Sequence, residues 1–183
     1  MKVTETGFNG LLIIEPLVHA DTRGYFMESY NHDAFQKVGI LFNPVQDNES
    51  SSVKGVIRGL HYQLRPFDQA KLIRVIEGKI LDVALDIRKG SKTYGKWLGV
   101  ELDSENKKQL FIPRGFAHGF SVLSKKATIQ YKCDNLYRPA YERGISINDP
   151  SLGIDWKTDI SKAIISDRDL DNPHFHNADN NFL

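Results

Sequence analysis

The sequence predicts an all-β protein, a sandwich or barrel built from many short strands. Short apolar runs separated by turn residues recur along most of the chain. The clearest run is Leu81–Ile87, in which every odd position is apolar and two even positions are Asp, a pattern typical of a strand with one face on a core. Helical patterns are sparse, which also favours an all-β class.

The apolar runs define the expected strands, and the polar segment Asp103–Asn106 is expected to form a turn between two of them. In chain order the runs are Leu11–Val18, Tyr25–Tyr30, Val53–Ile57, Lys71–Ile76, Leu81–Ile87, Trp97–Leu102, Gln109–Ile112, Phe120–Leu123 and Thr128–Cys133.

One helix of about two turns is expected over 31–39, because Asn31 can cap its first turn and Gly39 can end it. A second short helical piece is expected over 160–165. The chain shows no linker or internal repeat, so residues 1–183 are expected to form a single domain. Its last segment, 172–183, is a polar tail whose composition permits disorder.

Composition excludes several functional classes. The chain carries 24 Lys and Arg against 23 Asp and Glu, whereas a protein that neutralises many phosphates usually has a basic excess. No apolar run is long enough to span a membrane, and the N-terminus lacks the apolar core of a signal peptide. The single cysteine, Cys133, excludes an intrachain disulfide. We therefore expect a soluble, cytoplasmic protein that binds neither nucleic acid nor a membrane.

Several polar residues share strand faces with apolar residues. Lys71 lies on the expected face of Ile73 and Val75, where a lysine is costly to bury unless it is paired or functional. His118 and Tyr131 likewise share faces with apolar neighbours. Taken singly, Lys71 could extend from a strand end to water, and each ring could be a core residue with one satisfied hydrogen bond.

His61 lies within Arg58–Gln63, flanked by groups that could orient or charge it, and alone it would more often be structural. Together with His118, Lys71 and Tyr131, however, it makes a set of inward-facing polar residues in one small β domain. A pocket shared by these residues is the more economical explanation.

The spacing of glycines and histidines matches the cupin pattern, which is typical of a double-stranded β-helix, or jelly roll. Gly55 is followed after five residues by His61, and Lys71 is followed after six residues by Gly78. The second cupin motif, Pro-x-Gly-x-x-His, is intact over Pro113–His118. The pattern therefore predicts an all-β, cupin-type double-stranded β-helix with a few short helices.

The metal ligands of the cupin pattern are incomplete. Gln63 stands where the pattern has its second histidine, and Lys71 stands where it has a glutamate, so that only His61 and His118 persist. Divalent metals prefer neutral imidazoles and carboxylates, and a lysine ammonium in place of a carboxylate opposes their binding. We expect no catalytic metal.

A series of short motifs occurs in a specific order and spacing. They are Asp21–Glu28, Gln46–Ser50, Val56–Gln63, Ala70–Val75, Asp86–Arg88, Phe111–Phe120, Tyr131–Cys133 and Asp149–Pro150. In this order the chain, from about Gly7 to Asp169, resembles the dTDP-4-dehydrorhamnose 3,5-epimerases of dTDP-L-rhamnose synthesis. Each motif is weak alone, but the whole series is highly specific.

The resemblance implies inversion of C3 and C5 in a 4-keto-6-deoxy sugar carried on dTDP, with no cofactor. The C4 ketone acidifies both neighbouring C–H bonds, so the reaction needs a base, a group that stabilises the enolate, and an acid on the opposite face of the ring. At matching positions, the resemblance makes His61 the base, Tyr131 the acid and Lys71 the stabilising cation. Asp169 would hydrogen-bond His61, and Asp167 competes for this role.

For substrate binding, the resemblance implies Arg23, Phe26, Glu28, Gln46, Asn48, Arg58, His118, Tyr137, Glu142 and Arg168. Guanidinium groups pair bidentately with phosphate oxygens, so Arg23 and Arg58 suit the pyrophosphate. Phe26 and Tyr137 suit ring stacking, with ordinary packing as the alternative, and a solvated surface role is the alternative for Glu142 and Arg168. Arg168 also replaces the lysine of the family motif Ser-x-Lys-Asp, which keeps the charge and changes its geometry.

The family forms homodimers with an exchanged N-terminal strand, and the resemblance implies the same here. Two other functions stay open. One is a single-centre epimerase of a related dTDP-4-keto sugar, and the other is a cupin that binds a sugar nucleotide without this chemistry or with a metal. The filled acid and base positions favour the two-centre epimerase.

Overall fold

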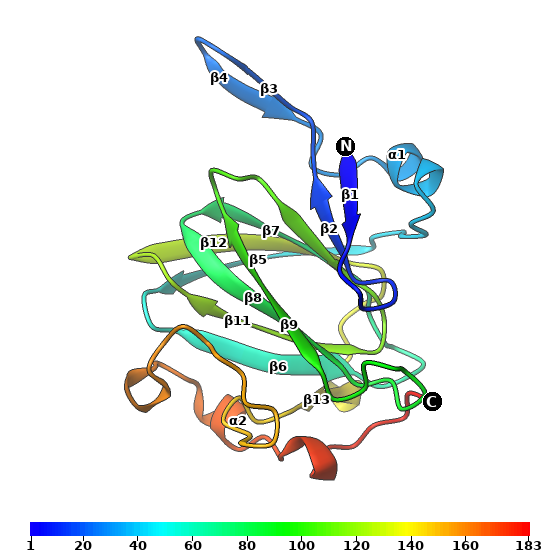
Figure 1. The fold of residues 1–183 in the computed structure, drawn as a ribbon, viewed down its shortest axis with the longest axis vertical. Helices are drawn as coiled ribbons and strands as arrows, with labels where there is room; N and C mark the ends of the chain where they lie inside the picture. The colour runs from blue at the N-terminus through cyan, green and yellow to red at the C-terminus, as the bar shows by residue number, and fades with distance from the viewer.

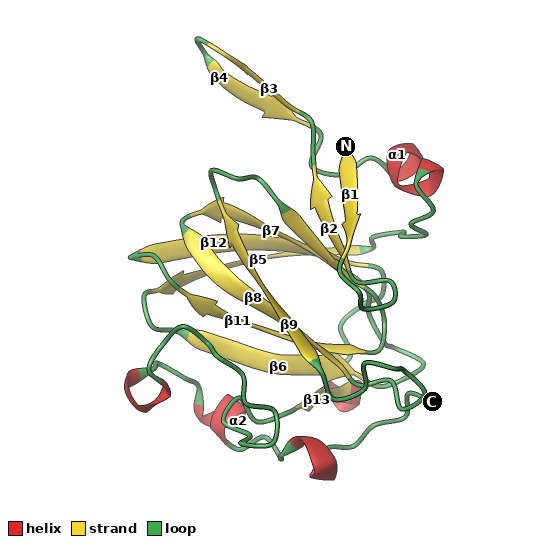
Figure 2. Ribbon diagram, in the orientation of Figure 1, coloured by secondary structure: helices red, strands yellow, loops and turns green.

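A computed structural model describes all 183 residues and confirms the all-β class (Figures 1 and 2). Two antiparallel sheets pack face to face. From edge to edge, the larger sheet contains β1 (Lys2–Glu5), β2 (Leu12–Glu15), β10 (Gln109–Ile112), β7 (Lys71–Glu77), β12 (Lys126–Cys133) and β5 (Gln46–Val53). The smaller sheet contains β13 (Glu142–Gly144), β6 (Ile57–Gln63), β11 (Phe116–Val122), β8 (Lys79–Asp86) and β9 (Trp97–Asp103).

A two-stranded hairpin of β3 (Val18–Asp21) and β4 (Gly24–Met27) projects away from the sandwich (Figure 1). The helices are short: α1 (His32–Lys37), α2 (Asp167–Leu170) and the one-turn 3-10 helices Pro139–Tyr141, Ile160–Lys162 and Phe175–Asn177. The predicted cap of the first helix is confirmed, because the Asn31 side chain accepts a hydrogen bond from the Ala34 amide at 3.1 Å. None of these helices combines the length and the apolar character that a membrane-spanning helix requires.

The inward faces predicted from residue parity are confirmed. Ile73 and Val75 of β7, Phe120 and Val122 of β11, and Ile129 of β12 are all buried in one apolar cluster between the sheets. Burial of such side chains is the main stabilising contribution of a sandwich, worth roughly 2 kcal/mol for each large side chain. Next to this cluster, the same inward faces carry polar residues that line a cavity.

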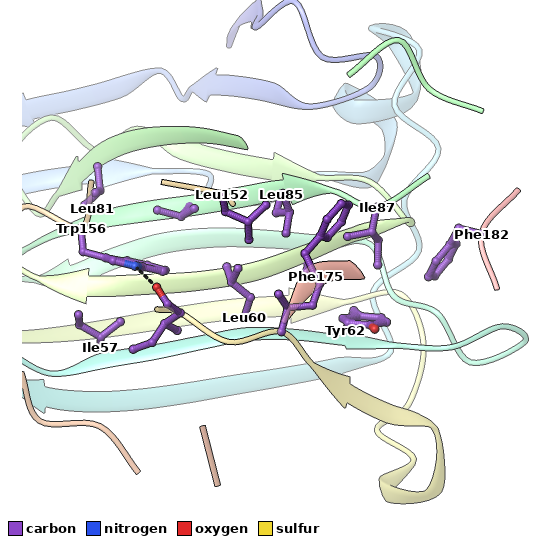
Figure 3. Packing of buried hydrophobic residues seen from close by; sticks show 14 of the residues in the cluster. Ile57, Leu60, Tyr62, Leu81, Leu85, Ile87, Leu152, Trp156, Phe175 and Phe182 are labelled. Atoms are coloured by element: carbon purple, nitrogen blue, oxygen red, sulfur yellow. Dashed lines mark hydrogen bonds between the residues drawn. The ribbon is translucent and has the colours of Figure 1, made fainter. Parts of the chain in front are cut away.

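A second core covers the outer face of the smaller sheet (Figure 3). Trp156 and Phe175, from the C-terminal segment, pack over Leu60 and Leu85 of the sheet, and Trp156 Nε1 donates a hydrogen bond to the Ile147 carbonyl at 2.9 Å. The polar tail 172–183 also packs here: Phe182 is 1% exposed, although the composition of this segment permits disorder.

Because of this second core, β8 is buried on both of its faces. The sequence predicts one buried face, but Val83 and Leu85 lie under the C-terminal segment while Asp82 and Asp86 point the other way and are fully buried. The prediction of a single buried face is wrong because the C-terminal segment covers what would otherwise be the solvent side.

The boundaries of several strands also differ from the predictions. The expected strand Val53–Ile57 is wrong, because Gly55, with φ of 84°, turns the chain from β5 into β6. The run Leu11–Val18 is divided at Pro16 into β2 and β3. Most of β5 and β6 contains no apolar run, because the inward positions of these strands are polar. The expected piece over 160–165 is a single 3-10 turn at Ile160–Lys162.

Candidate active site

A histidine–aspartate pair lies at the centre of the site. His61 Nε2, on β6, lies 2.7 Å from Asp169 Oδ1, on α2. The Gly59 amide donates to the other carboxylate oxygen at 3.2 Å. Burial opposes ionisation of Asp169, but the hydrogen bond and charge of His61 and the Gly59 amide outweigh it, so the pKa of Asp169 is below its usual value. Asp167 is exposed on the same short helix, so Asp169 is the carboxylate that contacts His61.

Two glycines allow β6 and β11 to approach closely beside this pair. A Cβ atom on Gly59 would lie 2.5 Å from the Gly119 Cα, and the φ of Gly59, 128°, is one that residues with side chains rarely adopt. In the same ladder His61 is the register partner of His118. The two histidines therefore lie side by side on neighbouring strands and line the same cavity.

Three of the four predicted catalytic residues, His61, Lys71 and Tyr131, line one cavity. Its volume is about 200 Å³, and its lining residues are Ser50, Arg58, His61, Lys71, His118, Gly119, Phe120 and Tyr131. An adjoining cavity of about 100 Å³ shares His61, Lys71 and Tyr131, and is also lined by Gln46, Asn48, Tyr137 and Glu142. A hollow of about 390 Å³ that is also lined by His61 includes Arg58, Arg168 and Asp169 in its lining.

Lys71 and Tyr131 reach the cavity from the larger sheet, opposite His61. Lys71 has no ion-pair partner, and burial lowers the pKa of its ammonium, an effect that Cys133 and Glu142 partly oppose. Burial raises the pKa of Tyr131, which keeps its phenol protonated, although nearby Arg58 acts in the opposite direction. The cavity therefore contains an imidazole, an unpaired ammonium and a phenol.

His118 is held by a carboxylate that sequence reasoning did not single out. Its Nε2 lies 2.7 Å from Asp82 Oδ1, and both side chains are buried, with Asp82 at 0% exposure. Asp82 Oδ2 has no hydrogen-bond partner in the structure. The alternation of Leu81–Ile87 places Asp82 on the face opposite the apolar residues. The sequence does not show that a second core covers the apolar face, so it predicts solvent around Asp82.

A polar cluster borders the adjoining cavity. The Tyr137 hydroxyl and the Arg168 guanidinium both donate to the Glu142 carboxylate. Burial opposes ionisation of Glu142, but these two donors outweigh it and hold its pKa below the usual value. The alternative in which Glu142 is a solvated surface residue is wrong, because its side chain is only 12% exposed.

A short chain of hydrogen bonds runs from this cluster to Cys133, beside Lys71. The Tyr137 amide donates to Gln46 Oε1 at 2.8 Å, and Gln46 Nε2 donates to Asn48 Oδ1 at 2.9 Å. Asn48 Nδ2 in turn lies 3.7 Å from the sulfur of buried Cys133, the register partner of Lys71. The sequence contained no signal for a role of Cys133 in this chain of contacts.

Gln63, which occupies a metal-ligand position of the cupin pattern, has its amide satisfied by backbone groups. Its Nε2 donates to the Phe67 carbonyl at 2.5 Å and to the Leu136 carbonyl at 3.2 Å, and its Oε1 accepts from the Arg138 amide at 2.5 Å. This side chain therefore ties a loop to β6. The structure contains no group of three His, Cys, Asp or Glu side chains arranged to hold a metal ion.

The remaining predicted binding residues lie on or next to the projecting hairpin, not at this cavity. Arg23 is paired with Asp21 at 2.5 Å, with its side chain 88% exposed, and Phe26 is 67% exposed. Glu28 follows β4 and accepts a hydrogen bond from the Asn31 side chain at 3.0 Å. Within one chain the structure therefore does not bring Arg23, Phe26 and Glu28 together with His61.

The amino-acid sequence of the chain matches those of known proteins. Residues 5–177 match the profile of the family described as dTDP-4-dehydrorhamnose 3,5-epimerase. A protein with this description from Methanothermobacter thermautotrophicus is 53% identical over 92% of this chain and 91% of its own length.

Two solved structures of epimerases have a fold similar to that of this chain. The dTDP-6-deoxy-D-glucose-3,5-epimerase of Legionella pneumophila, in complex with dTDP-4-keto-L-rhamnose, is 45% identical with a TM-score of 0.93, over 97% of this chain and 94% of that chain. A 3'-monoepimerase of Streptomyces bikiniensis, in complex with dTDP-quinovose, is 35% identical with a TM-score of 0.88, over 93% of this chain and 86% of that chain. The predicted cupin-type jelly roll is thereby confirmed.

Proposed function

The chain belongs to the dTDP-4-dehydrorhamnose 3,5-epimerase family and is an isomerase, and from this premise we propose its reaction and mechanism. The proposed reaction inverts C3 and C5 of dTDP-4-dehydro-6-deoxy-D-glucose, giving dTDP-4-dehydro-L-rhamnose without a cofactor. The observation that carries the proposal is that His61, paired with Asp169, shares one cavity with Lys71 and Tyr131.

His61 is the base in this mechanism. Because the depressed pKa of Asp169 keeps its carboxylate ionised, His61 Nε2 carries the hydrogen and donates it across the 2.7 Å contact. Nδ1 then holds the lone pair and accepts a proton from C3 or C5 of the sugar. The Asp169 carboxylate stabilises the imidazolium that results.

Lys71 and Tyr131 complete each inversion. When the C–H bond breaks, its electron pair forms a double bond to C4, and the C4 oxygen takes the negative charge, which Lys71 stabilises. Tyr131 donates its phenolic proton to the opposite face of the same carbon. The imidazolium then loses its proton to solvent, the phenolate regains one, and the same steps invert the second carbon.

The proposed substrate contacts surround this cavity. Arg58 would bind the diphosphate through its guanidinium, Tyr137 would stack on a ring of the nucleotide, and His118 would contact the sugar. The remaining proposed contacts from the same chain are Gln46, Asn48, Glu142 and Arg168.

Arg23, Phe26 and Glu28 are proposed to act in a second copy of the chain. The hairpin that carries Arg23 and Phe26 projects with these side chains exposed, which supports a homodimer in which each hairpin reaches the partner's cavity. A complementation assay tests this. A mixture of Arg23→Ala and His61→Ala proteins should regain activity through heterodimers that carry one intact site, whereas no regain would contradict a shared site.

A deuterium experiment tests the reaction itself. With dTDP-4-keto-6-deoxyglucose in D₂O, deuterium should enter at both C3 and C5, observed by NMR, and His61→Ala should abolish this exchange. Incorporation at one carbon alone would instead support a single-centre epimerase, a candidate favoured by the likeness to the Streptomyces bikiniensis 3'-monoepimerase. If no deuterium enters any 4-keto sugar nucleotide, the result would support a protein that only binds such a ligand.

We further propose that residues 1–183 act as one domain in the cytoplasm. Cores on both faces of the smaller sheet draw residues from the N-terminal, central and C-terminal parts of the chain, which supports one cooperative unit. A single thermal transition, seen alike by calorimetry and by tryptophan fluorescence, would be expected.

A further inference from the structure

β5 presents polar side chains to the interior of the sandwich. Along this edge strand of the larger sheet, Gln46, Asn48, Ser50 and Ser52 alternate with exposed residues, and Ser52 is the most buried of them, at 7% exposure. An interior strand face normally carries apolar residues, and a buried polar group lowers stability unless it has a partner. The hydrogen-bond partner of Ser52 can therefore explain why a serine occupies this position.

That partner is Arg58. The Arg58 Nε donates a hydrogen bond to Ser52 Oγ at 3.1 Å. Ser52 belongs to the larger sheet and Arg58 to the smaller one, so the bond links the two sheets beside the turn that leads from β5 into β6. Arg58 forms no ion pair in the structure, and Ser52 Oγ is the only protein acceptor of its guanidinium.

This contact determines which edge of the guanidinium stays free. An arginine binds an oxyanion with two parallel N–H groups, either Nε with one terminal nitrogen or the two terminal nitrogens together. Because Ser52 occupies Nε, the two terminal nitrogens are the available pair. Arg58 lines both the cavity of His61 and Tyr131 and the hollow beside Asp169, so this residue borders both spaces.

We propose that Ser52 is a positioning residue that orients Arg58 to receive the diphosphate of the nucleotide sugar through its terminal nitrogens. The inference rests on the proposed function and extends it by naming the residue that preorganises the diphosphate contact. An unanchored arginine at an exposed position loses rotamer entropy when it binds, and the Ser52 bond removes part of that cost before the ligand arrives. Ser52 does not touch the reacting sugar, so its effect falls on binding and not on proton transfer.

The test compares Ser52→Val with Ser52→Thr, two side chains of the same shape that differ in the hydroxyl. Ser52→Val should raise the KM for the dTDP-keto sugar and the Kd for dTDP by about 5- to 10-fold, with kcat within about twofold of wild type. Ser52→Thr should restore both constants to within about twofold. Ser52→Ala replaces the valine variant if thermal unfolding shows that the valine variant is misfolded.

Two matched controls sharpen this comparison. Ser51→Val alters the exposed neighbour of Ser52 on the opposite face of β5, and it should leave KM and Kd unchanged. In an Arg58→Ala background, Ser52→Val should weaken dTDP binding by less than about twofold, because the group that it orients is gone. Additive losses in the double variant would overturn the inference.

Other outcomes also contradict the inference. If Ser52→Thr binds dTDP as weakly as Ser52→Val, the hydroxyl is not responsible, and a fall in kcat at unchanged KM would assign Ser52 to the chemistry instead. If the wild-type protein binds dTDP but exchanges no deuterium, only the epimerase function is contradicted. The Ser52 variants can then still be compared by their affinity for dTDP. Wild-type protein that does not bind dTDP overturns both proposals.

Discussion

His61 Nε2 and Asp169 Oδ1 are 2.7 Å apart although 108 positions separate the two residues in the chain. The aspartate lies on a helix of one turn whose first turn is capped by Ser166, and the Gly59 amide holds its second oxygen. Since Asp169 is buried while Asp167 is exposed, two carboxylates that are almost adjacent in sequence have different surroundings.

Asp169→Asn should lower kcat by about 100-fold or more while dTDP affinity stays within about twofold. An amide carries no charge to stabilise the imidazolium, and its NH₂ group can stabilise the wrong His61 tautomer. Steady-state kinetics and dTDP titration measure the two effects. Asp167→Asn is the matched control and should retain wild-type turnover, so an equal loss in both variants would contradict the assignment of the pair.

Tyr131→Phe should separate proton removal from inversion. Because His61 remains, deuterium from D₂O should still enter the sugar with retained configuration, whereas inversion should slow by about 10²- to 10³-fold. Mass spectrometry measures the exchange and NMR coupling constants measure the configuration. Inversion at the wild-type rate would show that the proton comes from another group.

Lys71→Met should lower kcat by about 10²- to 10³-fold, because the enolate oxygen loses its cation. The matched control is Lys132→Met on the neighbouring strand β12, where the lysine pairs with Asp47 at 2.6 Å instead of facing the cavity. The control should keep wild-type turnover. A Lys71→Met protein as active as wild type would refute the proposed role of Lys71.

The same Lys71→Met substitution should increase stability. Burial lowers the pKa of Lys71 below the 10.5 of an ordinary lysine, so the unfolded chain binds this proton more tightly than the folded protein does. The resulting cost is fully present below the folded-state pKa and disappears as pH rises from there to 10.5. Thermal unfolding should therefore show a higher Tm for the variant at pH 7, with a difference that narrows at alkaline pH. A lower Tm at neutral pH would contradict a cost of burying this charge.

Gly59→Ala should destabilise the protein by about 3 kcal/mol or more, because the new Cβ would lie 2.5 Å from the Gly119 Cα on a backbone with φ of 128°. Gly55→Ala is the comparison. Its φ of 84° is also unfavourable, but no atom lies within 4 Å of the added Cβ, so about 1 kcal/mol is expected. Denaturant unfolding measures the loss of stability in both variants. Equal losses would show that the close approach of β6 to β11 adds nothing to the cost of a Cβ atom at Gly59.

Residue patterns by themselves were sufficient for the class of fold, the capped helix at Asn31, and the inward faces of Lys71, His118 and Tyr131. These features depend on local backbone geometry, since strand periodicity assigns each side chain to a face whatever the face later contacts. The order of short motifs was likewise sufficient for the family. Alternation could not show, however, that β8 is buried on both sides, because the C-terminal segment that covers it is distant in sequence.

Only the tertiary structure decided the partners. It assigned Asp169 and not Asp167 to His61, paired Asp82 with His118, and connected Ser52 to Arg58 across the two sheets. The first two contacts join residues 108 and 36 positions apart, and the third joins residues six positions apart whose strands belong to different sheets. The physical reason is that a strand's periodicity determines the direction of a side chain, whereas sheet order, register and the path of the C-terminal segment determine what that side chain contacts.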